Sequence, residues 1–565
     1  MSKDHHSDIF TIGIGGAAGD GVREAGLNLG QLLCELGYEV YISNTYPSLI
    51  RGGHNFTRIS FAKEKVWTDH AKLDVLIALN EESIGFHRAE FDKETVILAE
   101  TFEENDLKSI GNNAVTVPLI ASTKQLSAPL ITRNSVALGA VCYLLDLDLK
   151  LMHRILGEVF KNKMPEVNIK LAEVGYEHLK KIDFRHPKKI VPAKQKKELV
   201  DGNEAFGRGL LAAGLNFYVG YPMTPVTGLL HFLASRSLGE GNLIEPEASS
   251  ESDGSSESED LRAERPSGVR VIQPESELAV INMALGISYA GKRVAVGSAT
   301  GGFMLMEEAF SMAGIAELPL VVAVAERQAP ATGVPTYSSQ TDLRLAIHSG
   351  HGEFPRIVLI PGDPEECFLF GGLAMNLAWE YQLPVIVLLD KILCENSMTS
   401  LLLADQIKVE PALMSQKTGP EYGRYEITSD GISPMAFPGT PKTVVKITSY
   451  EHDSMGLTAE EAEPVRTMID KRFKKGETLL RELEKQETVK VYGDKESKDI
   501  IVFWGSTKGP VLEAIKYIDK PVKLLQIIWA EPFNSKKVTQ ELKDARNIIN
   551  IECNHNAQMA ALIRE

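Results

Sequence analysis

Residues 270–299 read RVIQPESELAVINMALGISYAGKRVAVGSA, a strand pattern, a helix pattern and a second strand pattern in direct succession. The strand candidates are VRVIQ at 269–273 and RVAVGS at 293–298. The helix pattern between them is apolar on nearly every face, which predicts that this helix is buried. A strand, a helix and a strand in this order predict two parallel strands joined by a crossover helix.

The same alternation continues on both sides of this stretch. A helix pattern, EAFGRGLLAAG, and a strand pattern, NFYVG, precede it, and the strand patterns LPLVVAVAE, RIVLIPG and PVIVLLD follow it. A further helix pattern, EECFLFGGLAMNLAWEY, lies between the last two strands. The region therefore predicts an α/β fold in which a parallel sheet is covered by helices on both faces.

A similar region opens the chain. Residues 9–19, IFTIGIGGAAG, are an apolar run followed by glycines, and a helix pattern then runs from Val22 to about Leu36. The strand pattern EVYIS comes next, with further strand patterns at 75–79 and 95–99. We expect a strand, a glycine-rich loop, a helix and a strand within a first domain that spans 8–183.

The remaining boundaries follow changes in composition. Residues 184–198 hold clustered lysines and two prolines, which predicts a linker, and 199–396 form the second α/β domain. Residues 397–497 contain few strand patterns, many turn residues and one charged helix pattern at 460–487, so we expect a linker region. A last α/β unit spans 498–565 and ends in a helix pattern.

Residues 245–265, EPEASSESDGSSESEDLRAER, differ in composition from everything around them. Such a polar stretch buries too little apolar surface to offset the entropy of ordering it. We expect a mobile acidic surface loop.

Composition excludes several classes of protein. The chain has 565 residues and a net charge of −16, which argues against a general nucleic-acid-binding surface. The sequence contains no apolar run long enough to span a bilayer, and no signal peptide is visible. We therefore expect a cytoplasmic protein that does not engage a membrane. The five cysteines are scattered, with none within four residues of another, so the sequence predicts no metal site or iron–sulfur cluster in this chain.

Tyr221-Pro222-Met223-Thr224-Pro225 follows one strand pattern and precedes a helix pattern. Pro225 suits a first helical turn and Thr224 can act as the N-cap, so the free N–H groups of this helix end could hold an anion. A rigid strand-to-helix turn without any ligand is the alternative.

Gln273-Pro274-Glu275-Ser276-Glu277 leads into the apolar helix. A buried carboxylate at Glu277 gains from the helix dipole but also needs a partner, which suits a bond to a cofactor nitrogen. A helix-capping glutamate is the alternative.

The loop 327–336, RQAPATGVPT, comes directly after the strand pattern LPLVVAVAE, at a strand end where ligands of open parallel sheets bind. Arg327 offers a planar donor fork suited to a carboxylate, and Thr332 and Thr336 offer hydroxyl groups. An exposed surface loop is the alternative.

The order of YPMTP, QPESE with its apolar helix, RQAPATGVPT and GHGEFPRIVL resembles the alpha subunit of 2-oxoacid:ferredoxin oxidoreductases. The resemblance implies that Glu277 bonds the aminopyrimidine ring of thiamine diphosphate, on a helix that also carries Gly286. It further implies that Pro222 and Thr224 lie at the cofactor. Arg327 would hold the carboxylate of the 2-oxoacid, with the substrate also contacted by the following side chains: Tyr221, Thr332 and Thr336.

The N-terminal domain resembles the gamma subunit of the same enzymes, fused ahead of the alpha part, through GIGGAAGDGVREAG and YPSLIRGGHNFTRISF. The C-terminal unit, with FWGSTKGP, resembles a transketolase-C-like domain. The resemblance thus implies several parallel-sheet domains: a gamma-type domain, a pyrimidine-type thiamine diphosphate domain and a transketolase-C-like domain. SATGGF at 298–303, Ala329 and Ala331 depart from the family pattern.

The family activity implied is the coenzyme A-dependent oxidative decarboxylation of a 2-oxoacid, such as pyruvate or 2-oxoglutarate, with ferredoxin as electron acceptor. Glu277 would share a proton with the aminopyrimidine, and Arg327 and Thr224 would orient the substrate. A beta subunit would complete a heterodimer and supply the Mg²⁺ site and a 4Fe–4S cluster.

Other readings remain open. A subunit of a related thiamine diphosphate enzyme, of the indolepyruvate oxidoreductase or transketolase type, would share the same motifs, and a scaffold protein would keep the fold without the chemistry. Gly19-Asp20-Gly21 with Asn44 imitates a magnesium-binding thiamine diphosphate motif, but no second asparagine adjoins Asn44. The same loop only approximates a dinucleotide-binding G-x-G-x-x-G pattern.

Overall fold

The computed structural model describes residues 9–47, 53–189, 191–192, 197–237 and 268–565. The acidic loop expected at 245–265 lies outside these ranges. The chain divides into two compact units, each assembled from separate segments of sequence. The first contains 1–202, 395–402 and 508–520, and the second contains 203–394, 403–507 and 521–565.

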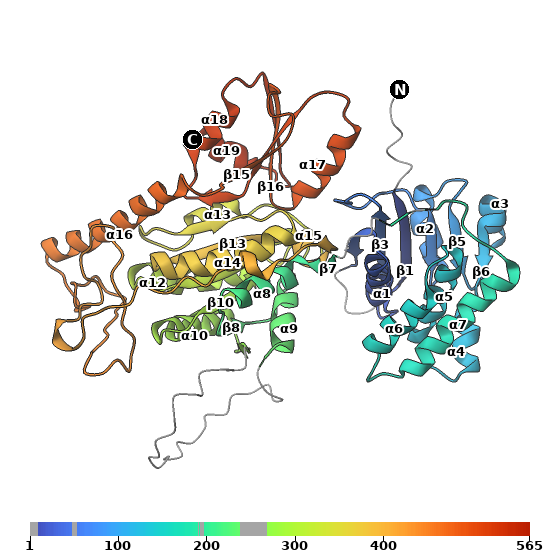
Figure 1. Cartoon of the computed structure of the whole chain (residues 1–565), viewed down its shortest axis with the longest axis horizontal. Coiled ribbons are helices and arrows are strands. Elements are labelled where there is room, and N and C mark those ends of the chain that lie inside the picture. The colour runs from blue at the N-terminus through green and yellow to red at the C-terminus, as the bar shows by residue number, and fades with distance from the viewer. Residues whose placement is uncertain (1–8, 48–52, 190, 193–196, 238–267) are drawn as a thin grey trace, which may run out of the picture. The chain divides into compact units, whose positions relative to one another are not determined.

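The first unit is built on an eight-stranded sheet of order β6-β5-β4-β1-β3-β2-β14-β7 (Figure 1). Its strands are β1 (Phe10–Ala17), β2 (Glu39–Thr45), β3 (His54–Ala62), β4 (Val75–Ala78), β5 (Val96–Ala99), β6 (Ala114–Thr116), β7 (Glu198–Asp201) and β14 (Ser397–Ser400). The expected succession of strand, glycine loop, helix and strand is confirmed, because β1 and β2 flank α1 (Val22–Glu35). The sheet is mixed, since β1 pairs in parallel with β4 but antiparallel with β3.

Four helices cover one face of this sheet through a shared apolar core: α1, α5 (Arg133–Leu144), α6 (Leu149–Val159) and α7 (Pro165–Ile182). Smaller helices complete the unit: α2 (Glu82–His87), α3 (Glu104–Ile110), α4 (Leu119–Gln125) and α17 (Lys508–Ala514). Asp20 of the glycine-rich loop makes contacts within the first unit. Its carboxylate accepts the Ala17 amide hydrogen and pairs with Arg133 at 2.7 Å. These contacts hold the Asp20 carboxylate against the loop and against α5.

The second unit contains a seven-stranded sheet of order β18-β12-β13-β11-β10-β8-β9. Its strands are β8 (Phe217–Gly220), β9 (Arg270–Ile272), β10 (Val294–Ala299), β11 (Leu320–Glu326), β12 (Ile357–Leu359), β13 (Pro384–Asp390) and β18 (Trp529–Glu531). All of them run parallel to their neighbours except β18, which pairs antiparallel with β12. The parallel sheet predicted from residues 201–396 is therefore confirmed.

Helices lie on both faces of this sheet, as the alternating pattern predicts. On one side α10 (Glu277–Tyr289) and α12 (Glu307–Ile315) share a core with alternate residues of β11, at 320, 322 and 324. On the other, α14 (Pro364–Tyr381) contacts β11 and β13 without joining that core. The remaining helices around the sheet are α8 (Gly202–Ala212), α9 (Thr227–Ser235), α11 (Thr300–Phe303), α13 (Leu343–His348) and α15 (Lys391–Glu395).

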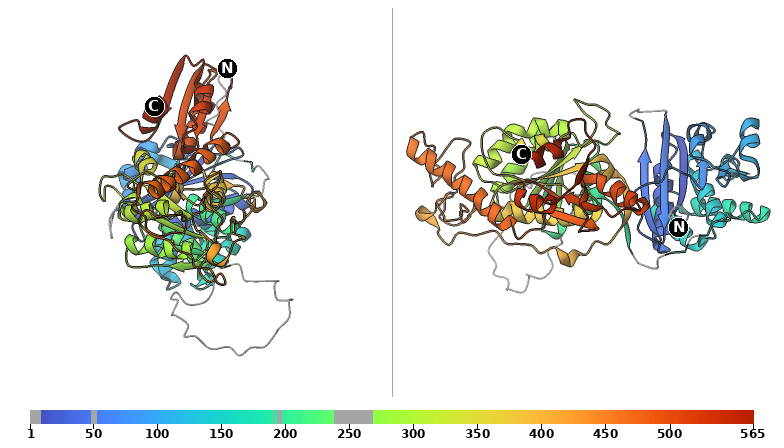
Figure 2. Two further views of the ribbon diagram at one scale, coloured as in Figure 1. Left: turned by 90° about the vertical axis from the view of Figure 1, so that its left-hand side faces the viewer. Right: turned by 90° about the horizontal axis from the view of Figure 1, so that it is seen from above.

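The C-terminal part of the second unit is a four-stranded sheet of order β15-β17-β16-β19. Its elements are β15 (Val489–Gly493), β16 (Asp499–Trp504), β17 (Lys523–Ile527), β19 (Asn547–Ile551), α18 (Ser535–Leu542) and α19 (Gln558–Arg564). The charged helix expected near 460–487 is α16 (Ala462–Leu483). It connects the irregular segment 401–461 to this small sheet (Figure 2).

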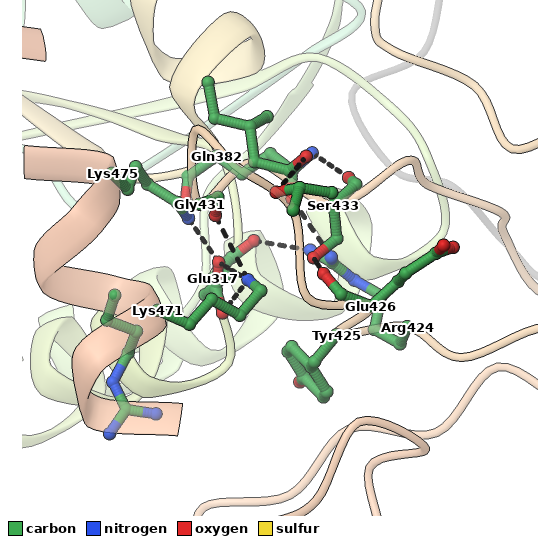
Figure 3. Close-up of polar contacts among 12 residues, drawn as sticks. Glu317, Gln382, Arg424, Tyr425, Glu426, Gly431, Ser433, Lys471 and Lys475 are labelled. Atoms are coloured by element: carbon green, nitrogen blue, oxygen red, sulfur yellow. Dashed lines mark hydrogen bonds and ion pairs between the residues drawn. The ribbon is translucent and has the colours of Figure 1, made fainter. Parts of the chain in front are cut away.

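One end of the irregular segment is fixed by a buried charge cluster, which Figure 3 shows around Glu317. Lys471 and Lys475 of α16 bond the Glu317 carboxylate, with Lys471 Nζ 2.8 Å from each oxygen. Arg424 donates to the Glu317 carbonyl at 2.7 Å and to Gln382 Oε1 at 3.0 Å. This Glu317 cluster joins α16 and the irregular segment to the turn between α12 and β11.

Candidate active site

The parallel strands of the second unit place three loops at one edge of the sheet. Strands β8, β10 and β11 end at 220, 299 and 326, and the segments 221–226, 300–303 and 327–337 follow them directly. Because the carboxyl ends of parallel strands share one edge, these segments gather where ligands of open α/β sheets bind.

Glu277 is the first residue of α10 and is almost wholly buried, with 4% of its surface exposed. The Ser276 side chain caps the helix by accepting the Ala279 amide hydrogen. The buried Glu277 Oε1 has no hydrogen-bond partner among the described residues. A buried carboxyl oxygen in this state calls for a donor that the described residues do not supply, because leaving it unpaired costs about 1–3 kcal/mol.

Gly302 makes room for this carboxyl group. A Cβ atom at position 302 would lie 2.6 Å from Glu277 Oε1 and would overlap the Ser298 hydroxyl. Gly302 belongs to the segment SATGGF at 298–303. The space beside Glu277 thus depends on the short helix α11 that follows β10.

Arg327 and Thr224 meet at the same edge. Arg327 Nη1 donates to the Thr224 carbonyl oxygen at 2.7 Å, so the two loops expected to share a substrate lie side by side. Burial lowers the pKa of Arg327 from its ordinary value, and the guanidinium stays charged. The remaining donors of its fork are suited to a carboxylate.

The helical role expected for Thr224 and Pro225 is wrong. Helix α9 begins at Thr227, its N-cap position is Val226, and no side chain caps it. Residues 224–226 form a turn ahead of the helix, and Arg327 engages the Thr224 carbonyl. An anion at this helix end would therefore not be held by a Thr224 cap.

The loop after Arg327 folds back as a tight hairpin, in which the Gln328 amide donates to Tyr337 O at 3.1 Å. Thr336 lies in its base, 8% exposed, and its hydroxyl has no partner among the described residues. Thr332 lies at the exposed tip, and within the described chain it makes no hydrogen bond to the other predicted site residues. Tyr221 and Pro222 are exposed at the neighbouring loop.

The expectation that α10 is buried on every face is wrong in one respect. Leu278 and Met283 are 52% and 43% exposed, although the opposite face of the helix is in the core. Met304 and Leu305, just after Gly302, are also about half exposed at 51% and 50%. An apolar helix whose outer face is left uncovered by the described residues is typical of a subunit interface.

Sequence reasoning missed a group of buried acids beside this site. Glu326 ends β11, Asp390 ends the adjacent β13 as its register partner, and Asp342 precedes α13. The Asp342 amide donates to Glu326 Oε2 at 2.6 Å, and Thr300 Oγ1 donates to Asp342 Oδ2 at 2.7 Å. The signal available was an acidic residue at the end of each of two adjacent apolar strands.

The chain was compared with known proteins. Residues 11–178 match a family model for pyruvate ferredoxin/flavodoxin oxidoreductase, and 208–471 match one described as the thiamine diphosphate-binding part of pyruvate flavodoxin/ferredoxin oxidoreductase. The alpha subunit of 2-oxoacid:ferredoxin oxidoreductase from Saccharolobus solfataricus is 31% identical over 605 residues, covering 98% of this chain and 92% of that protein. The chain belongs to the 2-oxoacid:ferredoxin oxidoreductase alpha-subunit family. It is thus a subunit of an oxidoreductase.

Further similarities agree with this family assignment. The alpha subunit of 2-oxoacid:ferredoxin oxidoreductase 2 from Aeropyrum pernix is 30% identical and covers 99% of this chain and 93% of its own length. The solved 2-oxoglutarate:ferredoxin oxidoreductase of Magnetococcus marinus, with 2-oxoglutarate, coenzyme A and succinyl-CoA bound, superposes with a TM-score of 0.84 at 28% identity, over 99% of this chain and 94% of that one. The α/β fold class with several parallel-rich sheets and a thiamine diphosphate-binding region is thereby confirmed. Among the helices that the structure describes, none has the length and hydropathy to span a bilayer.

Proposed function

We propose that this oxidoreductase subunit contributes the aminopyrimidine side of a thiamine diphosphate site, at which a 2-oxoacid is oxidatively decarboxylated to an acyl-CoA. The observation that carries the proposal is the buried, unpartnered Glu277 carboxyl group facing Gly302 at the carboxyl edge of the sheet. A ring nitrogen with a hydrogen to share is the partner that such a carboxyl group lacks. When bound, thiamine diphosphate supplies the carbon nucleophile that attacks the 2-oxoacid.

The side chains around Glu277 have separate tasks in this proposal. Glu277 holds a proton at Oε1 and exchanges it with the aminopyrimidine. Arg327, fixed by its bond to Thr224 O, presents its free donors to the substrate carboxylate. Thr336 offers its unpartnered hydroxyl, and Tyr221 and Thr332 border the opening as further substrate contacts. Pro222 and Thr224 shape the cofactor side.

A beta subunit completes the enzyme in this proposal. It carries the diphosphate–Mg²⁺ side of the cofactor and the 4Fe–4S cluster that passes electrons to ferredoxin, and coenzyme A accepts the acyl group. The apolar face formed by Leu278, Met283, Met304 and Leu305 supports a partner next to Glu277. The naming of the relatives as alpha subunits supports it as well.

The proposal also divides the chain by function. Residues 8–183 form the gamma-like domain, 199–396 the pyrimidine-type domain and 498–565 the transketolase-C-like domain, with 184–198 and 397–497 between them. The separate family matches at 11–178 and 208–471 support the division between the first domain and the second.

Coexpression with its beta subunit tests the function directly. The copurified complex is expected to reduce a viologen dye only with a 2-oxoacid, coenzyme A and thiamine diphosphate together. Pyruvate, 2-oxoglutarate and a branched-chain 2-oxoacid, assayed in parallel, rank the substrates. A complex that contains an intact cluster but reduces no dye with any of the three would contradict the proposal.

A further inference from the structure

The group of acids beside the candidate active site, Glu326, Asp342 and Asp390, contains three carboxyl groups and no cation. Glu326 and Asp390 are 1% and 3% exposed, and Asp342 is partly buried. In the part of the chain that the structure describes, no lysine or arginine pairs with any of these three carboxyl groups, and no cluster suited to a metal ion is found. Buried like charges without a cation cannot all stay ionised, because each would repel the next in a medium of low dielectric constant.

The three carboxyl groups differ in the hydrogen bonds that they accept. Asp390 accepts the amide hydrogens of Leu393 at 3.0 Å and Ser506 at 3.3 Å. Asp342 accepts the Thr300 hydroxyl. Burial raises the pKa of both aspartates, but each has donors that oppose this shift by favouring its anion. Glu326 receives a single amide, that of Asp342, on Oε2.

Most of the surroundings of Glu326 raise its pKa. Burial, followed by the charges of Asp342 and Asp390, raises the pKa of Glu326 well above its usual range, against the Asp342 amide, which lowers it. The other ionisable group that faces it is the Cys553 thiol, whose pKa is raised by burial and by Asp390 and Glu326. The neighbouring Arg327 directs its guanidinium to Thr224 O instead.

We infer that Glu326 works as a permanently protonated acid, a positioning residue that holds Asp342 and, through it, the Thr300–Gly302 turn against Glu277. Oε2 accepts the Asp342 amide, so the proton resides on Oε1. Asp342 in turn accepts the Thr300 hydroxyl at the start of α11, and Gly302 of that helix lies beside Glu277 Oε1. Glu326 therefore acts on the proposed thiamine site through two intermediates and touches no substrate.

Glutamine copies a protonated glutamate in shape and hydrogen bonding, which makes Glu326→Gln the decisive variant. A raised pKa means that the folded chain retains a proton that the unfolded chain releases, so stability falls as pH rises from the usual glutamate range to the raised value. Glu326→Gln lacks this loss. Its melting temperature should match the wild type near pH 5 and exceed it by several degrees, about 3–6 °C, at pH 9.

Glu317→Gln is the matched control, because Glu317 is equally buried at 1% exposed but is surrounded by cations. It should lower the melting temperature at both pH values. The infrared spectrum provides a second measurement, in which the band of a protonated carboxylic acid should persist at pH 8 and vanish in Glu326→Gln. A Glu326→Gln chain that fails to fold or melts earlier at every pH, or a wild type without this band, overturns the inference.

Only the catalytic readout rests on the proposed function. In the complex, Glu326→Gln should retain kcat within about twofold, whereas Glu326→Ala should lower kcat about tenfold or more with a smaller change in the 2-oxoacid KM. Equal kcat values for the two variants would remove the positioning role. If the complex has no activity but the infrared band and melting curves behave as stated, the proposed function fails and the protonated Glu326 stands.

Discussion

At the scale of single residues, two buried glutamates show how surroundings determine chemistry. Glu317 lies among Lys471, Lys475 and Arg424, which lower its pKa, although burial alone would raise it. Glu277 has no cation and no hydrogen-bond donor within the described chain for Oε1. The first is a structural anion, and the second is the group that we propose bonds a cofactor nitrogen.

Replacing Glu277 by Gln should abolish turnover while thiamine diphosphate still binds. Glutamine keeps the size of the side chain in the space beside Gly302 but cannot exchange the proton. Catalytic proton transfers contribute about 10²–10⁴ in rate, and the loss should lie near the upper end. Dye reduction by the complex and calorimetric titration with the cofactor measure the two effects, with Glu275→Gln, an exposed neighbour, as control. More than a tenth of wild-type activity in Glu277→Gln would leave Glu277 a helix-capping residue only.

Replacing Arg327 by Lys should weaken the 2-oxoacid far more than coenzyme A. Lysine keeps the charge but loses both the bond to Thr224 O and the two-pronged geometry. A charge-assisted hydrogen bond contributes about 1.5–3 kcal/mol. The KM for the 2-oxoacid should therefore rise roughly 10–100-fold. Steady-state kinetics with each substrate varied in turn decide the matter, and an equal rise for both substrates would place Arg327 outside the substrate site.

At the scale of elements, the Glu317 cluster makes the attachment of α16 sensitive to pH. Burial, more than the neighbouring Lys471, lowers the pKa of Lys475 to about 7 despite its bond to Glu317. The folded chain then binds fewer protons than the unfolded chain between about pH 7 and the usual lysine value, so the free energy of unfolding should rise with pH across that window.

Lys475→Met should flatten this pH dependence. One proton contributes a slope of at most about 1.4 kcal/mol per pH unit, so urea denaturation between pH 7 and 9 can resolve it. The adjacent Lys474→Met is the control, because Lys474 is exposed on the same helix and pairs with Glu477. Identical slopes for the two variants would show that Lys475 is protonated throughout.

The sequence predicted elements well where local pattern and burial coincide. Helix α1, strands β4 and β5, the parallel core of the second unit and α16 all lie where the periodicity places them. The prediction of a helix N-cap at Thr224 failed. The Thr224 carbonyl is engaged by Arg327, which lies 103 residues away, and sequence spacing does not reveal such a contact. Local pattern failed for the outer face of α10 as well, since sequence alone does not distinguish an exposed apolar residue from a buried one.

The candidate site was predicted in part for the same reason. The bond between Arg327 and Thr224 confirms that their two loops meet, and the burial of Glu277 agrees with its expected setting. The acids at Glu326, Asp342 and Asp390 were missed because each belongs to a different segment, and only the register of β11 with β13 brings two of them together. The catalytic roles stay predictions until the variants are measured.

At the scale of the whole molecule, the chain should be an incomplete enzyme. Purified alone, it should contain no stoichiometric iron, show no brown colour and reduce no dye, because its five cysteines lack cluster spacing. Iron analysis and visible spectra of the isolated chain test this, with the coexpressed complex as the positive control. One cluster equivalent of iron in the isolated chain would contradict the prediction.

The composite sheet of the first unit affects how the protein is made. Strand β14 lies between β2 and β7 in that sheet, yet nearly two hundred residues of the second unit separate it from β7 in sequence. During synthesis the N-terminal sheet must wait with its β2 edge unpaired until residue 400 has left the ribosome. Nascent chains halted before that point would expose an unpaired strand edge that can pair with other chains. The order of translation, as well as the contacts of the folded state, therefore affects whether this protein folds or aggregates.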